Sequence, residues 1–113
     1  MIGDKKEINT YVVEIWHEVQ ASPLGSSAAR KFTAEHTYVV LPKLLKEKNI
    51  KMIADYHLDP EHRAILVFEA PNIEALRDLL YEAHYLHWCH ARIYPTTPLA
   101  ELDKWQREQP TVT

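Results

Sequence analysis

Histidine and cysteine residues close together near the C-terminal end suggest what chemistry this sequence can support. The stretch His84-Tyr85-Leu86-His87-Trp88-Cys89-His90 carries three of the seven histidines and the single cysteine. Imidazole and thiolate groups suit zinc, copper or nickel and do not suit ions that prefer carboxylates. We therefore expect a transition-metal site that draws on His84, His87, Cys89 or His90, a subset of which should suffice, with His17 or His57 completing it. His84 and His87 would be neighbours if this stretch is helical, whereas in a strand His87 and Cys89 would share one face and His90 the other. The H-x-x-H-x-C-H spacing matches no standard zinc signature, so the identity of the metal stays open.

A second set of residues favours acid–base chemistry instead. An imidazole would move the proton, a carboxylate would orient that imidazole, and a guanidinium would hold an anionic substrate. The catalytic candidates are His90, Glu14, His57 and Asp55, and the substrate-binding candidates are Arg92, Trp16 and Trp88. This alternative is a cofactor-free isomerase or lyase with a small-molecule ligand in a cleft walled by tryptophans. Haem binding through His84 is a further alternative.

Composition excludes several classes of function. Thirteen Lys and Arg against 16 Asp and Glu give a net charge of −3, which argues against nucleic acid as a partner. No apolar run approaches the ~20 residues of a membrane helix. Gly3 and Gly25 are isolated, which excludes a glycine-rich phosphate loop. Residues 1–10 lack a signal core and Cys89 has no cysteine partner, so we expect a cytoplasmic protein.

The pattern of apolar residues predicts a ferredoxin-like α+β domain that spans residues 1–113. The predicted strands are Thr10–Glu18, Ile50–Leu58, Arg63–Ala70 and Tyr85–Tyr94. The predicted helices are Ala28–Lys48, which Pro42 should kink or divide, a helix from Pro71-Asn72 to about Ala83, and Leu99–Gln106. The predicted irregular segments are the loose residues 1–9, a loop at Gln20–Ser27 and a turn at Asp59–His62. Residues 97–113 form the predicted C-terminal helix and tail.

This topology gathers the ends of several predicted elements. In the strand order 4-1-3-2, strands 1 and 2 run one way and strands 3 and 4 run the other way. Five histidines should then lie at one end of the sheet: His17, His57, His62, His84 and His87. His36 lies inside the first predicted helix and should be apart from them.

Strand alternation assigns residues to the two faces of the sheet. The helix-covered face should carry Val13, Ile15, Ala91 and Ile93. The open face should carry His90, a cross-strand pair of Glu14 with Arg92, and Asp55 and His57 of the second strand. Its apolar residues should be Val12, Trp16, Leu66, Phe68 and Trp88. Because no helix remains to cover this apolar set, we expect a homodimer that packs face to face.

The junction VFEAPNIEAL (Val67–Leu76) carries a family resemblance. It resembles the small dimeric α+β barrel proteins, and especially a family of uncharacterised and nickel-binding ferredoxin-like dimers with YEAP-D/N-x-E-A-hydrophobic at this place. The resemblance covers roughly residues 10–96 and implies the fold. The same superfamily includes YciI-like proteins, muconolactone-isomerase-like enzymes and haem-degrading monooxygenases, so it does not select one function.

Overall fold

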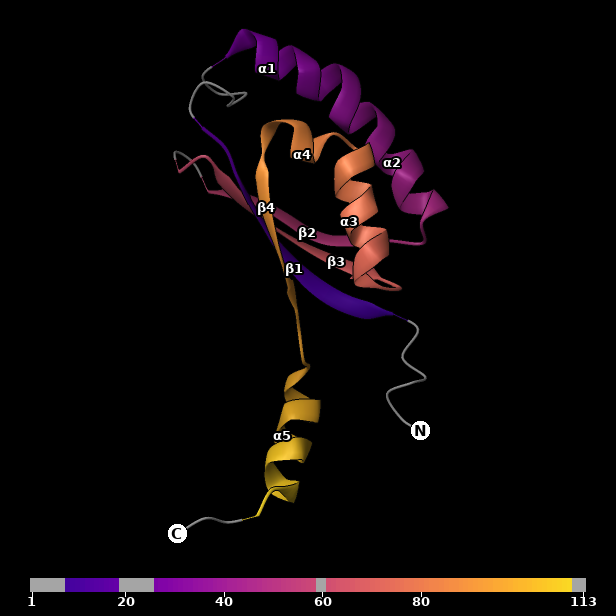
Figure 1. The fold of residues 1–113 in the computed structure, drawn as a ribbon, viewed down its shortest axis with the longest axis vertical. Helices are drawn as coiled ribbons and strands as arrows, with labels where there is room; N and C mark the ends of the chain where they lie inside the picture. Colours follow the sequence, from indigo (N-terminus) through magenta and orange to yellow (C-terminus); the bar gives the residue numbers. More distant parts are fainter. Residues whose placement is uncertain (1–7, 19–25, 59–60, 111–113) are drawn as a thin grey trace.

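The computed structural model describes residues 8–18, 26–58 and 61–110 of this protein. A four-stranded sheet carries α1 to α4 on one face, and α5 extends away from it (Figure 1). The elements are β1 (Asn9–Trp16), α1 (Ser27–Phe32), the π-helical segment η3 (Thr33–Thr37), α2 (Tyr38–Glu47), β2 (Lys51–Leu58), β3 (Arg63–Ala70), α3 (Ile73–Glu82), α4 (Tyr85–Trp88), β4 (His90–Pro95) and α5 (Leu99–Glu108). This arrangement confirms the predicted α+β class. None of the helices in these ranges is long and apolar enough to cross a membrane.

The sheet has the order β2-β3-β1-β4, which is the predicted 4-1-3-2 read in reverse. Every neighbouring pair is antiparallel, so β1 and β2 run in one direction and β3 and β4 run in the other. The predicted strand directions are therefore correct. As a consequence, β1 and β2 end at the edge of the sheet where β3 and β4 begin.

The hydrophobic core lies between the sheet and the helices. Val13 of β1, Phe68 of β3 and Leu79 of α3 are all fully buried. The helices begin at residues that cap them: the Ala75 N–H donates to Asn72 Oδ1 at 2.7 Å, and the Ala29 N–H donates to Ser26 Oγ at 3.2 Å. These caps satisfy backbone donors that the first turn of a helix leaves free.

The predicted open-face positions of Leu66 and Phe68 are wrong. Val13 lies opposite Leu66 in the β1–β3 register, and directly opposed residues of two strands share a face. Leu66 is 1% exposed and Phe68 is not exposed, so both belong to the core under the helices. The open face instead carries Ile65 and Val67. Both alternating sets of β3 are apolar, and for that reason alternation alone does not orient this strand.

The predicted strand Tyr85–Tyr94 is correct only in its second half. His84 has φ 71° and ψ 11°, a left-handed conformation that ends α3, and the chain then makes the short helix α4. The His87 N–H donates to His84 O at 3.1 Å, and the Cys89 N–H donates to Tyr85 O at 2.8 Å. Trp88 is therefore on α4 over the helix-covered side, and its predicted position on the open face is also wrong.

The first predicted helix is divided, but not at Pro42. Pro42 lies inside α2, and the interruption is the π-helical segment η3 directly before it. The ring of Pro42 would clash with the carbonyl four residues earlier, on Tyr38. The π-helical segment η3 ends at Thr37, directly before Tyr38. The helix therefore changes from π to α geometry just before the carbonyl that Pro42 affects.

Some predicted segments lie wholly or partly outside the described residues. These are residues 1–7 of the loose N-terminal segment, most of the loop at Gln20–Ser27, the first half of the turn at Asp59–His62, and residues 111–113 of the tail. Within the second half of that turn, the Glu61 N–H donates to Leu58 O at 2.7 Å.

Candidate functional site

The histidine-rich end of the sheet is where β1 and β2 finish and β3 and β4 start. His17 follows β1, His57 is the second-last residue of β2, and His90 begins β4. His62 precedes β3, and its carbonyl accepts a hydrogen bond from the His17 N–H at 3.1 Å. For His17, His57 and His62, the prediction that strand directions gather these histidines at one end of the sheet is therefore correct.

The five predicted metal ligands do not form one group. His84 and His87 approach each other with 3.3 Å between their Nδ1 atoms. Cys89 contacts His17 instead, with 3.8 Å between Sγ and Nδ1. His90 is on the other face of the sheet. Within residues 8–18, 26–58 and 61–110, no three His, Cys, Asp or Glu side chains are arranged to hold a metal ion.

His36 lies beside His84, and its predicted separation from the other histidines is wrong. The two ring centroids are 6.1 Å apart, and the ring of Phe32 packs against both, at 4.7 Å from His36 and 5.7 Å from His84. The prediction placed residues 85–94 in a strand, so it did not include the helix α4 that follows His84. The four-residue spacing of Phe32 and His36 places both on one face of the helix, but their contact with His84 is between separate segments and carries no local sequence signal.

The thiol of Cys89 is less reactive than its position among histidines suggests. Burial raises the pKa of the Cys89 thiol to about 12, so the thiol is protonated at neutral pH. Metal ligation requires the thiolate, and burial opposes its formation. The neighbouring imidazole of His17 also packs against Trp88, with ring centroids 5.2 Å apart.

The open face carries a polar group around Glu14, but not the pair that alternation predicts. Glu14 and Arg92 are opposite in register, yet Glu14 Oε2 pairs with the Arg63 guanidinium, and the Tyr94 hydroxyl donates to Glu14 Oε1 at 3.3 Å. The Arg92 guanidinium lies 5.6 Å from the centre of the Trp16 ring, as a cation–π contact. The expected Glu14–Arg92 ion pair is therefore not present.

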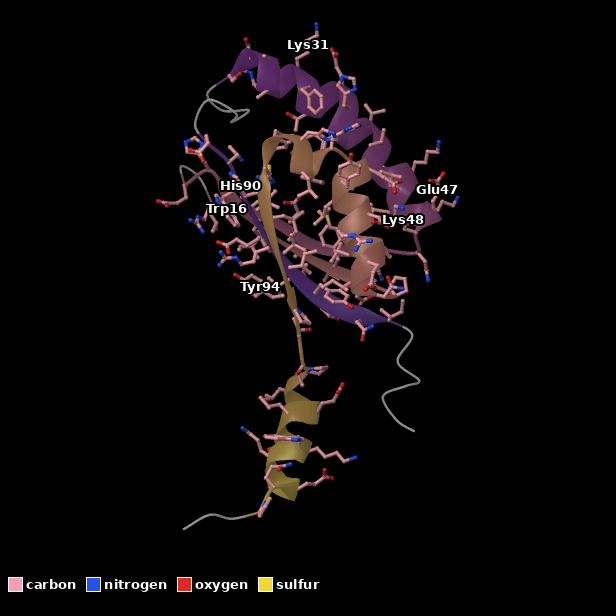
Figure 2. All side chains as sticks on the ribbon, in the orientation of Figure 1. Trp16, Lys31, Glu47, Lys48, His90 and Tyr94 are labelled. Atoms are coloured by element: carbon pink, nitrogen blue, oxygen red, sulfur yellow. The ribbon has the colours of Figure 1, made fainter. Side chains whose placement is uncertain are left out.

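Trp16 also stacks on His90, with ring centroids 5.5 Å apart, and Figure 2 shows the two side chains together on the same side of the sheet. A hollow of about 260 Å³ lies next to this stack, lined by Glu14, Trp16, Arg63 and Arg92. The predicted proton carrier and substrate-binding groups His90, Arg92 and Trp16 are thus together on this face. Trp88 is not with them.

Asp55 and His57 are on the helix-covered face, and their predicted place on the open face is wrong. Asp55 is opposite the buried Leu66, and His57 is opposite the buried Ala64. A register shift between Met52 and Ala54 inverts the alternation along the rest of β2. The two side chains form the predicted acid–base pair, with 3.0 Å between His57 Nε2 and Asp55 Oδ1.

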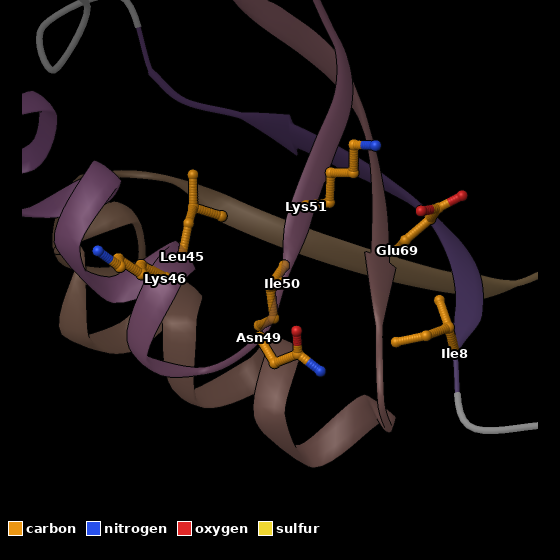
Figure 3. A pocket seen from close by; sticks show the side chains of 7 residues that line it. All are labelled: Ile8, Leu45, Lys46, Asn49, Ile50, Lys51 and Glu69. Carbon is orange, nitrogen blue, oxygen red and sulfur yellow. The ribbon is translucent and has the colours of Figure 1, made fainter.

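A second hollow of about 310 Å³ lies at the opposite end of the sheet (Figure 3). Its lining residues are Ile8, Leu45, Lys46, Asn49, Ile50, Lys51 and Glu69. None of them is a histidine or a cysteine, so the chemistry that the sequence predicts lies elsewhere.

No family model matches the chain, and no curated protein matches it. One similar solved structure is an uncharacterized protein, TM1266, from Thermotoga maritima. It is 18% identical, with a TM-score of 0.42, and the match covers 80% of this chain and 100% of that chain.

Proposed function

We propose that this protein binds a transition-metal ion, nickel, copper or zinc, through His84 and His87. The observation that supports this proposal most directly is the 3.3 Å between their Nδ1 atoms. Two nitrogens that each lie about 2.0–2.1 Å from one tetrahedral ion are about 3.3–3.4 Å apart. The two imidazoles thus have the spacing of two corners of a metal site before any metal is added.

His36 is the third ligand in this proposal. Its ring is 6.1 Å from that of His84, whereas the rings of His84 and His87 are 4.9 Å apart. Binding therefore requires the exposed His36 side chain to turn toward His84 until their ring separation approaches the 4.9 Å between His84 and His87. Nickel and copper accept nitrogen-rich ligand sets with open positions, and water would fill the rest of the coordination shell.

Calorimetric titration of tag-free protein with nickel, copper and zinc at neutral pH tests this function. We expect His84→Ala and His87→Ala each to weaken binding at least about tenfold, and His36→Ala to have a smaller effect. His90→Ala is the matched control, because it removes an imidazole from the other face and should leave the affinity unchanged.

Affinity should also fall as the solution is acidified, because a protonated imidazole cannot hold a metal. Equal affinity of the wild type and the His84→Ala, His87→Ala double variant would contradict the proposal, as would the absence of binding below millimolar metal. Loss of binding in His90→Ala alone would move the site to the open face.

We also propose that the protein is a cytoplasmic homodimer that packs through the open face of the sheet. The support is the uncovered face in Figure 1, which carries Ile65 and Val67 of β3 and the exposed Tyr56 and Leu58 of β2. Exposed apolar patches of this kind favour association. Sedimentation at micromolar concentration should show a dimer that Trp16→Glu converts to monomer, with Val39→Glu of the exposed surface of α2 as control. A wild-type monomer would contradict this interface.

A further inference from the structure

The hollow of about 260 Å³ on the open face contains two guanidinium groups and one carboxylate. Its lining residues come from the three neighbouring strands β3, β1 and β4: Glu14, Trp16, Arg63 and Arg92. Trp16 is opposite Arg63 in the register of β1 with β3. Glu14, two residues before Trp16, is opposite Arg92 of β4, so all four side chains share one face. The proposed metal site uses none of them.

Glu14 is already held by two other side chains of this hollow and its rim. Its Oε2 pairs with the Arg63 guanidinium, and its Oε1 accepts a hydrogen bond from the Tyr94 hydroxyl at 3.3 Å. The side chain of Glu14 is 20% exposed, so this pair is partly shielded from solvent. Glu14 is thus oriented toward Arg63 and Tyr94, although its partner in register is Arg92.

Arg92 has a positive charge that nothing in the described part of the chain neutralises. Within residues 8–18, 26–58 and 61–110, no carboxylate pairs with its guanidinium and no atom accepts a hydrogen bond from it. The guanidinium lies 5.6 Å from the centre of the Trp16 ring, a contact that uses none of its five N–H donors as hydrogen bonds. His90 stacks on Trp16 in turn, with ring centroids 5.5 Å apart (Figure 2). Arg92 is therefore positioned by a supported ring, and its donors stay available.

The charges and the size of the hollow restrict what it can hold. Arg63 and Glu14 compensate each other, so the lining carries one excess positive charge, that of Arg92. A single negative charge balances it, whereas a dianion would leave excess negative charge beside Glu14. The volume is below the ~300–1,000 Å³ of pockets for drug-sized ligands, so the ligand is small.

We propose that this hollow binds a small monocarboxylate through the Arg92 guanidinium. Both groups are planar, and they can form two parallel N–H···O bonds that fix the orientation of the ligand. Arg63 offsets the repulsion between the ligand and Glu14, and so acts as a positioning residue. The Trp16 ring supplies an apolar wall for the hydrocarbon part of the ligand.

This site lies on the face that is also the proposed dimer interface. A second copy on this face would keep water away from the ion pair and thereby strengthen it. Strand β4 is the outer strand of the sheet, so the hollow reaches the sheet edge at Arg92. All contacts that define the site belong to one protomer. The proposal therefore depends neither on the dimer nor on the His84–His87 metal site.

Propionate and propionamide are suitable probes because they have the same size and shape and differ in charge. Titration of ¹⁵N-labelled full-length protein at pH 7.5 should show propionate binding, with shifts at residues 14–16, 63 and 90–94 and at the Trp16 indole N–H. Propionamide should bind at least about fivefold more weakly, and so should inorganic phosphate, which carries more than one negative charge at this pH. Equal binding of propionate and propionamide, tighter binding of phosphate, or propionate shifts confined to the helix-covered side would overturn the proposal.

Two substitutions that change the charge in opposite directions test the roles of Arg92 and Glu14. Arg92→Gln should weaken propionate binding about five- to tenfold and leave the thermal midpoint without ligand unchanged, because this exposed side chain has no ion pair to lose. Glu14→Gln should strengthen binding about two- to threefold, because it removes a negative charge beside the ligand. A gain in affinity cannot result from loss of folding.

Arg77→Gln is the matched control for Arg92→Gln. Arg77 is on α3, on the other side of the sheet, and its side chain is 61% exposed. Its substitution removes the same charge and should leave propionate affinity unchanged. Unchanged affinity in Arg92→Gln, equal losses in Arg92→Gln and Arg77→Gln, or a lowered affinity in Glu14→Gln would overturn the proposal.

Discussion

The left-handed backbone at His84 can be tested with a pair of substitutions that differ only in one methyl group. With φ 71° and ψ 11°, His84 occupies a region that costs a residue with a Cβ about 1–2 kcal/mol. Glycine avoids this penalty but loses more conformational entropy on folding, about 0.5–1 kcal/mol. His84→Gly should therefore be about 0.5–1 kcal/mol more stable than His84→Ala.

The comparison isolates the backbone because both variants remove the same imidazole. Both lose the ring contacts with Phe32, His36 and His87, so those contributions cancel in the difference. Urea unfolding followed by tryptophan fluorescence gives the two free energies of unfolding. The slopes of the unfolding free energy with urea concentration should agree, since the surface exposed on unfolding is the same.

An alanine variant as stable as the glycine variant would refute this account of the turn. Both variants should also lose metal affinity to the same extent, because neither carries the His84 ligand. If the glycine variant were more stable and still bound nickel like the wild type, the backbone argument would stand and the proposed metal site would fail. His84 is thus both a proposed metal ligand and a residue in a strained backbone conformation. Strained residues of this kind are common at binding sites.

Other predictions concern the core, the cysteine and a helix cap. Phe68→Ala should cost about 3–5 kcal/mol of unfolding free energy and Val67→Ala clearly less, because Phe68 is fully buried under the helices; equal losses in urea unfolding would contradict the face assignment. Burial raises the pKa of Cys89 to about 12, so iodoacetamide at pH 8 should label the unfolded chain and leave the native one unlabelled, as mass spectrometry would show. Asn72→Ala should cost about 1 kcal/mol in the same unfolding assay, because it leaves the Ala75 N–H without its acceptor.

Local signals were sufficient for much of the fold. Strand β3 has the predicted bounds Arg63–Ala70, and Pro71-Asn72 leads into α3 as expected, because a capping side chain marks a helix start within a few residues of sequence. The strand order also followed from the order of elements. These features depend on neighbours along the chain, which a sequence displays directly.

The face assignments failed where the sequence offers two equivalent choices. In β3, Ala64, Leu66 and Phe68 alternate with Ile65 and Val67, and either set could face the helices. In β2, a register shift at residues 52–54 moved Asp55 and His57 to the face opposite the predicted one. Such irregularities depend on the partner strand, so periodicity within one strand does not reveal them.

The backbone at His84 also explains why the candidate metal ligands separate. If residues 85–94 formed a continuous strand, alternation would place His87 and Cys89 together and His90 opposite them. The left-handed residue starts a helical turn instead, and this turn brings His87 back beside His84. Cys89 then leaves the turn in an extended conformation toward His17, and His90 begins β4 on the other face, against Trp16. The left-handed His84, the turn α4 and the extended Cys89 together separate this stretch into an imidazole pair, a buried thiol contact and an open-face stack. The i, i+3 spacing of His84 and His87 predicts that these two meet if the stretch is helical, but spacing alone does not choose between the helix and the strand.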